Sequence, residues 1–440
     1  MRTLFLGLKF LFIIFLVSCN SKRVNVLVTS PWVGTKQLGV AGSYTAGYGI
    51  TSDRAGSIYV TGYTDGGLDG NTLTGNLDFF VTKYDVSGLK QWTRQLGVAS
   101  VDTLGNGVTS DSANNVYVAG YTDGGLDGNT LIGTRDFVVT KYSTEGVKQW
   151  TRQLGVTGAQ TLGNAITSDS LDNIYVAGYT SGALDGQTLT GTVDFFVTKY
   201  NSAGVKQWTR LLGVASATTF GNGITSDSLD NIYVAGYTTG GLDGNSLTGG
   251  ADFFVTKYNS AGVKQWTRQL GGTILTVVGQ DITSDTADNV YVAGYTSGAL
   301  DGQTFMGTTD FFVTKYNSAG VKQWTRQLGV TSFQTYGAGI TSDSLNNVYI
   351  TGDTGGGLDG NTLTGDSDFF VTKYDSAGVK QWTRQLGIGA GAEAEGYAIT
   401  SDLNNNVFVT GYTDGGVDGN TLTGLSDFFI TKYNIDGFKQ

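Results

Sequence analysis

The segment DFFVTKYDSAGVKQWTRQLG, residues 368–387, decides the fold of this chain. Two runs rich in β-branched and aromatic residues flank the short turn DSAG, and the first run is apolar at both odd and even positions. This pattern is typical of a β-hairpin whose sheet is covered on both faces. Near-copies of the hairpin begin at Asp78, Asp136, Asp194, Asp252, Asp310, Asp368 and Asp427. The chain must therefore be explained as an array of seven units.

The units repeat with a period of 58 residues, as the tryptophans show. These are Trp92, Trp150, Trp208, Trp266, Trp324 and Trp382. One extra residue lies in the loop segment IGAGAEAEG, residues 388–396, before the last copy. Each unit reads GNGITSD, a tight turn, IYVAGYT, a glycine-rich loop, DFFVTKY, a second tight turn and VKQWTRQLG. This order predicts four antiparallel strands, a to d, joined as a meander.

Sheets that are apolar on both faces must be stacked, either as a closed propeller or as an open solenoid. An open solenoid needs polar terminal caps, and none is found in the sequence. The last unit ends in GFKQ, before the tryptophan half of its strand d, whereas PWVGTKQLG at residues 31–39 supplies that half. We therefore predict an all-β fold over residues 32–440. It is a seven-bladed β-propeller of four-stranded antiparallel blades, closed by an N-terminal strand that completes the last blade.

The amino-acid composition excludes several classes of function. Glycine is 68 of 440 residues and proline is one, which suits many short strands joined by glycine turns. The chain has no histidine, so serine–histidine triads and histidine metal sites are excluded. Aspartates at seven equivalent positions indicate a scaffold, since a catalytic site needs unequal neighbours. We predict a protein that is not an enzyme and has no cofactor or metal. A carbohydrate-active enzyme remains an alternative, with Glu393 and Glu395 as the unrepeated acids close together.

The loop between strands b and c carries the best candidate metal ligands. Its aspartate recurs as Asp69, Asp127, Asp185, Asp243, Asp301, Asp359 and Asp418, each followed by glycine. With Asp65 and Asn71 in the same loop, the oxygens of these side chains are of the type that binds Ca²⁺. Asp65 is replaced by serine, threonine or glycine in other copies, and Asp-Gly is ordinary turn chemistry. We therefore expect these aspartates to stabilise turns.

The N-terminus has the features of an export signal. Arg2 and Lys9 are followed by the apolar run FLFIIFLV, residues 10–17, which is too short to span a bilayer. The sequence LVSC then resembles the bacterial lipobox, in which cleavage before the cysteine precedes its acylation. The resemblance implies a lipoprotein signal peptide over residues 1–18. An ordinary secretory signal with a chance cysteine is the alternative.

Cleavage would make the acylated Cys19 the membrane anchor, with residues 19–31 as a short tether. Cys19 is the single cysteine, so no disulfide forms within the chain. We expect the bacterial cell envelope as the location, with lipid as the protein's only membrane attachment. Asn20 after the cysteine favours the outer membrane, and the surface and periplasmic faces both remain open.

Net charge limits the partners. Losing Arg2 and Lys9 with the signal changes the formal charge from −10 to −12, because the basic residues fall from 27 to 25 against 37 acids. An acidic body without a basic stripe is not suited to nucleic acid. We expect a monomer whose ligand is a protein or a glycan.

The long loops mark the candidate binding surface. In this meander the b–c and d–a loops emerge on one face, and both are longer than the a–b and c–d turns. The d–a loops vary between copies, so the candidate contact residues lie there: Tyr44, Phe333, Tyr336, Glu393 and Glu395. Unselected loop variation is the alternative explanation.

The segment GITSDSLDNIYVAGYT, residues 223–238, resembles the bacterial seven-bladed β-propeller repeat (SBBP) family, a relative of NHL repeats. The segment KYDSAGVKQW, residues 373–382, is similar to the hairpin of quinoprotein propellers and of an envelope-assembly lipoprotein. These resemblances imply the propeller fold. The lipobox and the long loops on one face add the expectation that the protein is a lipid-anchored binding module. The alternative function is a periplasmic assembly scaffold. We expect the strand d tryptophans to pack between blades and not to hold a cofactor.

Overall fold

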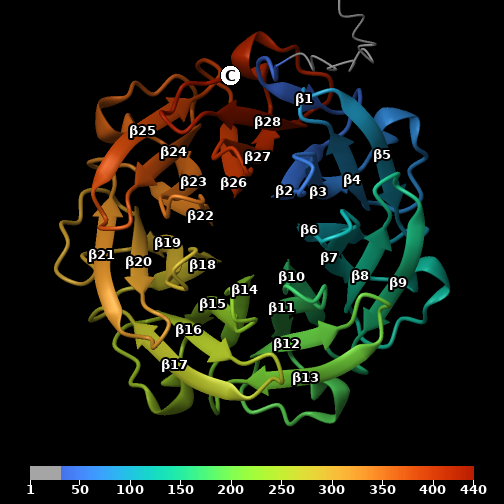
Figure 1. Ribbon diagram of the computed structural model, residues 1–440, viewed down its shortest axis with the longest axis vertical. Coiled ribbons are helices and arrows are strands. Elements are labelled where there is room, and N and C mark those ends of the chain that lie inside the picture. Colours follow the sequence, from blue (N-terminus) through green and yellow to red (C-terminus); the bar gives the residue numbers. More distant parts are fainter. Residues whose placement is uncertain (1–30) are drawn as a thin grey trace, which may run out of the picture. The chain divides into compact units, whose positions relative to one another are not determined.

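The structure is a computed structural model that describes residues 31–440, so the signal peptide, Cys19 and most of the tether lie outside the described residues. Residues 31–440 form a ring of seven four-stranded sheets around a central axis (Figure 1). In the first blade, β2 (Thr45–Ser52) lies at the axis, followed outward by β3 (Ile58–Thr64), β4 (Asp78–Tyr84) and β5 (Lys90–Leu96). The predicted all-β, seven-bladed propeller is confirmed.

Blades two to six repeat this order as β6–β9, β10–β13, β14–β17, β18–β21 and β22–β25. Their bounds are β6 Thr103–Ser110, β7 Val116–Thr122, β8 Asp136–Tyr142, β9 Lys148–Leu154, β10 Thr161–Ser168, β11 Ile174–Thr180, β12 Asp194–Tyr200, β13 Lys206–Leu212, β14 Thr219–Ser226, β15 Ile232–Thr238, β16 Asp252–Tyr258, β17 Lys264–Leu270, β18 Val277–Ser284, β19 Val290–Thr296, β20 Asp310–Tyr316, β21 Lys322–Leu328, β22 Thr335–Ser342, β23 Val348–Thr354, β24 Asp368–Tyr374 and β25 Lys380–Leu386.

The seventh blade contains β26 (Ala394–Ser401), β27 (Val407–Thr413) and β28 (Asp427–Tyr433), and its outer strand is β1 (Lys36–Leu38). β1 pairs antiparallel with β28, as predicted for the closing strand.

The closing strand is assembled from both ends of the described chain. The Gly34 N–H donates to the Gln440 carbonyl at 2.9 Å, which places the two segments end to end. Trp32 is 3% exposed and its ring lies 5.2 Å from that of Phe408, edge to face. These contacts show that the N-terminal segment supplies the missing half of strand d.

Apolar side chains on both faces of each sheet form the core between blades. In β12, Phe195 stacks 5.0 Å from Phe254 of the fourth blade, while the next residue, Phe196, stacks 5.0 Å from Phe137 of the second. Trp208 joins the interface between blades three and four, and its indole N–H donates to the Ser260 carbonyl of the fourth blade at 3.3 Å. The tryptophan therefore packs between blades, as expected.

A ring of hydrogen bonds around the axis shows that the propeller is closed. The last residue of each innermost strand is a serine whose hydroxyl donates to the serine carbonyl of the preceding blade. The donors are Ser52, Ser110, Ser168, Ser226, Ser284, Ser342 and Ser401, at distances between 2.7 and 3.3 Å. Because Ser52 bonds to Ser401, the series ends where it begins, which a straight or spiral array does not allow.

Candidate binding surface

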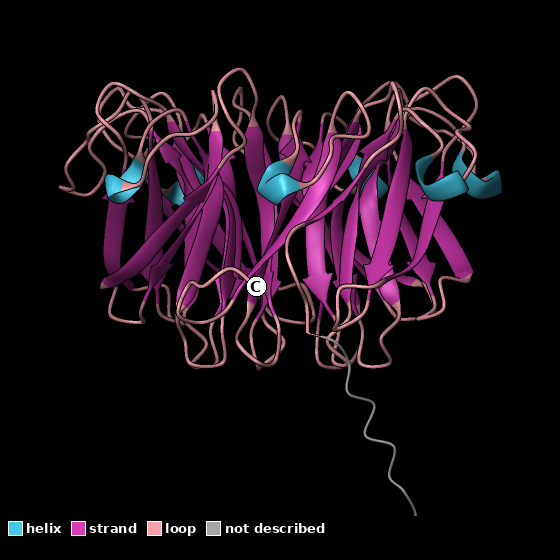
Figure 2. Ribbon diagram, turned by 90° about the horizontal axis from the view of Figure 1, so that it is seen from above, coloured by secondary structure: helices cyan, strands magenta, loops and turns pink. Residues whose placement is uncertain are grey.

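The two faces of the ring differ in loop length (Figure 2). We call the side with the a–b and c–d turns, 53–57 and 85–89 in the first blade, the tight-turn face. The opposite side, with the b–c and d–a loops at 65–77 and 97–102, is the long-loop face. Antiparallel pairing within each blade puts every loop of one kind on the same side, so the prediction of a shared long-loop face is confirmed.

The b–c loops are fastened to the outer rim of the ring. In the first copy, Leu68 is fully buried and its N–H donates to the Gln95 side-chain carbonyl at 3.0 Å. Asp69 adopts a left-handed conformation with φ 55° and forms an ion pair with Lys90. The same ion pair recurs in every copy of the described ring. These aspartates stabilise turns, as expected, and the d–a loops are left as the variable part of the long-loop face.

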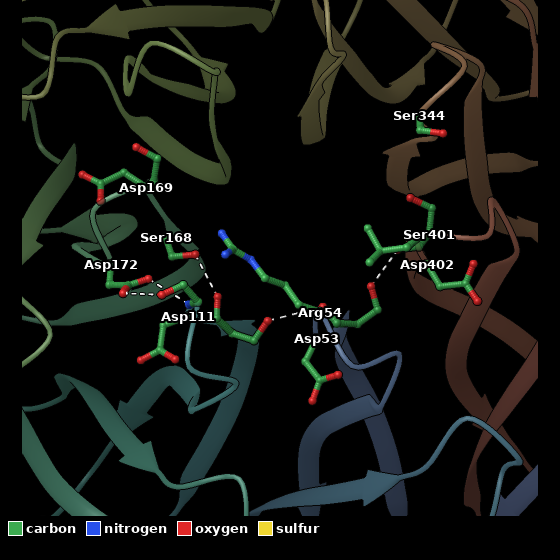
Figure 3. A pocket seen from close by; sticks show the side chains of 14 residues that line it. Asp53, Arg54, Asp111, Ser168, Asp169, Asp172, Ser344, Ser401 and Asp402 are labelled. Carbon is green, nitrogen blue, oxygen red and sulfur yellow. Dashed lines mark hydrogen bonds between the residues drawn. The ribbon is translucent and has the colours of Figure 1, made fainter. Parts of the chain in front are cut away.

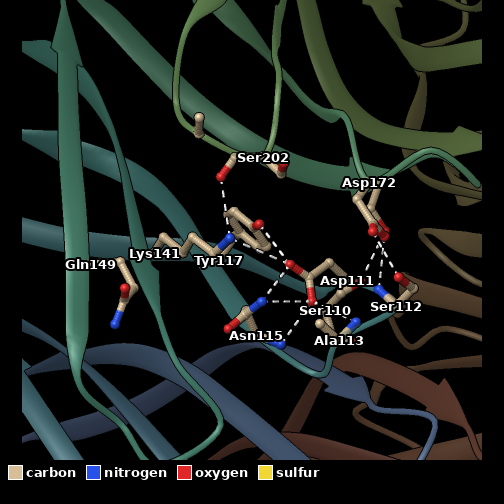
Figure 4. A network of polar contacts seen from close by, with 12 residues as sticks. Ser110, Asp111, Ser112, Ala113, Asn115, Tyr117, Lys141, Gln149, Asp172 and Ser202 are labelled. Carbon is tan, nitrogen blue, oxygen red and sulfur yellow. Dashed lines mark hydrogen bonds and ion pairs between the residues drawn. The ribbon is translucent and has the colours of Figure 1, made fainter.

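The aspartates at the ends of the innermost strands also hold turns (Figure 4). Asp111 accepts hydrogen bonds from the Ala113 and Asn115 backbone N–H groups at 3.0 and 2.8 Å, and from the Tyr117 hydroxyl at 2.8 Å. Burial opposes ionisation of Asp111, but these donors and Lys141 hold the pKa of its carboxyl below the ordinary value. A carboxylate so fully engaged is structural.

A cavity of about 380 Å³ lies at the mouth of the central channel on the tight-turn face (Figure 3). Four members of the serine ring line it, together with Asp53, Asp111, Asp169 and Asp402, and Arg54 points into the opening. Each of these aspartates accepts backbone N–H groups of its own turn. The aspartates at this mouth therefore occupy near-equivalent positions, and their carboxylates are already engaged in hydrogen bonds within their own turns.

A larger cleft, of about 600 Å³, opens on the long-loop face over the sixth blade, between the loop that joins the fifth blade to it and the loop that leads into the seventh. Phe333, Tyr336, Glu393 and Glu395 line it, so four of the five candidate residues lie together. Tyr44 is not among the lining residues. Tyr44 lies in the loop that joins the seventh blade to the first, and its backbone N–H donates to the Asp65 carboxylate at 2.6 Å.

Sequence reasoning missed Asp353 and Asp366, which also line this cleft. Asp353 on β23 occupies a position that is tyrosine in the other six copies, at Tyr63, Tyr121, Tyr179, Tyr237, Tyr295 and Tyr412. Two residues on, Gly355 replaces the aspartate, serine or threonine of the other copies. The segment TGDTGG therefore carried a signal, namely two departures from the repeat within three residues.

Phe333 is unusual for its place in the loop. The equivalent residues in two other seams, Ala159 and Ala217, are each 7% exposed, whereas Phe333 is 48% exposed. Its ring lies beside Gly355, where a Cβ would be 3.6 Å from the aromatic carbon. The ring is thus in ordinary contact distance of this position, at the rim of the cleft.

The cleft is acidic. Burial, followed by the charges of Glu395 and Glu393, raises the pKa of Asp353 to about 7. Burial also raises the pKa of Glu395, although the Tyr397 hydroxyl donates to it at 2.8 Å. The lining residues include no lysine or arginine. Such a site favours cationic or hydrogen-bond-donating ligand groups.

Within residues 31–440, no group of three or more histidine, cysteine, aspartate or glutamate side chains is placed to hold a metal ion. The same residues contain no helix long and apolar enough to cross a membrane.

The closed ring has turns that are similar from copy to copy on one face and loops that vary between copies on the other. This arrangement defines a β-propeller scaffold suited to protein interaction. The chain belongs to the SBBP β-propeller repeat family, which matches residues 33–69, 91–127, 149–184, 207–243, 265–300, 323–359 and 381–417.

Two curated proteins are similar to the chain. The uncharacterized WD repeat-containing protein L264 of Acanthamoeba polyphaga mimivirus is 24% identical over 79% of this chain and 33% of that protein. Regulatory protein FlaEY of Caulobacter vibrioides is 27% identical over 42% of this chain and 22% of that protein. The chain thus spans a third or less of the length of these relatives.

Two solved structures are similar to the chain at low TM-scores. A chain of the mitotic checkpoint complex is 12% identical with a TM-score of 0.49, covering 96% of this chain and 99% of that one. An ulvan lyase of polysaccharide lyase family PL25 is 12% identical with a TM-score of 0.45, covering 86% and 93%. At these values the likenesses bear on neither ligand nor activity.

Proposed function

We propose that this chain is a non-enzymatic binding module that takes a protein ligand on its long-loop face. The cleft over the sixth blade, bounded by the loops that enter and leave that blade, is the principal contact. The observation that carries the proposal is the convergence of an exposed aromatic ring, Phe333, with Asp353, Glu393 and Glu395 at a place where the repeat departs from its own pattern.

The chemistry of the cleft selects the ligand. Carboxylates without a basic neighbour attract lysine and arginine side chains, and arginine also stacks on aromatic rings. The adjacent aromatic surface adds apolar contact, which commonly dominates the affinity of an interface. We therefore expect the ligand to present a basic segment to this cleft.

A glycan is the second candidate. The presence of both Phe333 and Tyr336 in the cleft lining favours it, because aromatic faces stack on sugar rings while carboxylates accept hydrogen bonds from hydroxyl groups. In both cases an acylated Cys19 would hold the module in the cell envelope.

The test uses the full-length acylated protein in detergent against an array of lysine- and arginine-rich peptides and an array of envelope glycans. Phe333→Ala and Glu393→Gln should each weaken the selected peptide at least about tenfold, which corresponds to about 1.4 kcal/mol. Leu275→Ala is the matched control, because it alters the same loop position at another seam and should leave affinity unchanged. Equal binding by all four proteins would refute the cleft as the contact.

Glycans captured in place of peptides, with the same sensitivity to Phe333→Ala, would establish the second candidate. The alternative role as a periplasmic assembly scaffold is decided by protease treatment of intact cells. Degradation would place the propeller at the cell surface, and protection would place it in the periplasm.

A further inference from the structure

The tight-turn face carries two rings of exposed apolar side chains. The outer ring is the residue after the glycine of each c–d turn, between 55 and 64% exposed. It comprises Leu89, Val147, Val205, Val263, Val321, Val379 and Phe438. The inner ring is formed by leucines of the a–b turns, between 61 and 74% exposed. It comprises Leu171, Leu229, Leu345 and Leu403.

The fold does not require these residues to be apolar. In the third blade the c–d turn uses only the backbone of Val205, whose N–H donates to the Asn201 side chain at 2.9 Å. The a–b turn likewise uses the N–H of Leu171, which donates to Asp169 at 3.0 Å. Serine or lysine would make the same backbone bonds. Branched or aromatic side chains in all seven outer positions therefore indicate a surface that is covered in use.

The opposite face lacks such a ring. Its exposed large apolar residues do not recur around the ring: Ile132 and Met306 share one loop position in two of the seven copies, and Ile274 stands where other copies have serine or glycine. Single exposed apolar residues are normal on any protein surface. The repeated apolar pattern is thus a property of the tight-turn face.

The chain joins the ring at this same face. Gly34 bonds to Gln440, which follows the c–d turn containing Phe438. Pro31, the first described residue, therefore lies beside the tight turns. Cys19 precedes Pro31 by twelve residues, which span at most about 40 Å even when fully extended. An acyl anchor on Cys19 would bring this face to the membrane first.

We propose that the tight-turn face rests on the phospholipid bilayer that holds the Cys19 anchor. The two apolar rings contact the boundary between headgroups and acyl chains, and the long-loop face is directed away from the membrane. The bilayer is zwitterionic, because the body is acidic and anionic headgroups would repel it. This arrangement leaves the cleft at Phe333 open to its ligand, but it does not depend on what that ligand is.

The experiment places single cysteines in the full-length acylated protein, in phosphatidylcholine vesicles. Val205→Cys and Leu229→Cys report from the tight-turn face, and Ile132→Cys is the matched control on the long-loop face. Each cysteine carries an environment-sensitive fluorophore, and the acylated Cys19 takes up none. Labels on the tight-turn face should shift to shorter wavelength and be quenched about twofold by nitroxide-bearing lipid, since interfacial contacts lie within reach of shallow quenchers. The control label should show neither effect.

Three results would overturn the proposal. Unshifted labels at positions 205 and 229 would mean a tethered body that does not touch the bilayer. A shift without quenching by lipid would mean that a second copy or another protein covers the face. Labelling of the protein without an introduced cysteine would show that Cys19 is not acylated. Ligand binding in detergent is independent of all three results, so the proposed function and the membrane contact fail separately.

Discussion

Replacing Trp32 with alanine should destabilise the whole ring, because its side chain is buried in the core at the closing blade. Its indole is 3% exposed and packs against Phe408 and Tyr84, with centroid distances of 5.2 and 6.2 Å. Burying about 200 Å² of aromatic surface stabilises by about 5 kcal/mol at about 25 cal/mol per Å². Measured tryptophan-to-alanine changes in cores cost about 3–5 kcal/mol, so we expect a loss in that range.

Urea unfolding, followed by far-ultraviolet circular dichroism, measures this loss. Val33→Ala is the matched control, since Val33 is 68% exposed and adjacent in the chain. It should change the free energy of unfolding by less than about 0.5 kcal/mol. If Trp32→Ala behaves like Val33→Ala, the N-terminal segment does not close the propeller in solution, and the reasoning from the split strand is wrong.

Three further substitutions test the site and the packing. Burial and Glu395 raise the pKa of Asp353 from 3.8 to about 7, so the folded state keeps a proton that the unfolded state has lost, and the free energy of unfolding falls as pH rises through this window. Asp353→Asn should remove that fall and gain about 2–4 kcal/mol at pH 8, and urea titrations at pH 5 and pH 8 that show the same pH dependence in both proteins would contradict this. Gly178→Ala places a Cβ 1.8 Å from the Leu162 carbonyl oxygen and should cost more than about 3 kcal/mol, whereas Gly186→Ala enters open space at φ 72° and should cost about 1–2 kcal/mol. Similar losses in thermal melts of the two glycine variants would show that the close approach is not rigid.

The ring could be predicted because the sequence of each copy shows which of its faces must be buried. Alternating apolar residues such as Phe195 and Phe196 require a neighbour on each side of every blade, and the split of strand d between residues 31–39 and 437–440 requires the ends to meet. Neither inference needs knowledge of a distant contact, since period and alternation are both visible along the chain.

The cleft was only partly predictable, because it depends on contacts across a seam. Variable loops identified Phe333 and Glu393 by their chemistry. Asp353 was overlooked because it belongs to a strand, where the pattern leads one to expect a packed tyrosine. Only the register that pairs Asp353 with Tyr336, and the approach of Glu395 from the next blade, places it in the cleft. The ion pair between Asp69 and Lys90 could likewise not be predicted from the sequence, because the two residues are 21 positions apart.

The position of the departures argues for a site more strongly than their chemistry does. Asp353 replaces a tyrosine, Phe333 stands at a loop position where other copies have non-aromatic residues such as Ala159 and Leu275, and the extra residue of the array lies in the loop that contains Glu393. These changes are separated by up to 60 residues in sequence, yet Phe333, Asp353 and Glu393 line one cleft. A carboxylate with a raised pKa costs folding stability, and the other six copies avoid that cost with tyrosine. A destabilising exception grouped with an exposed aromatic ring is better explained by a ligand than by packing.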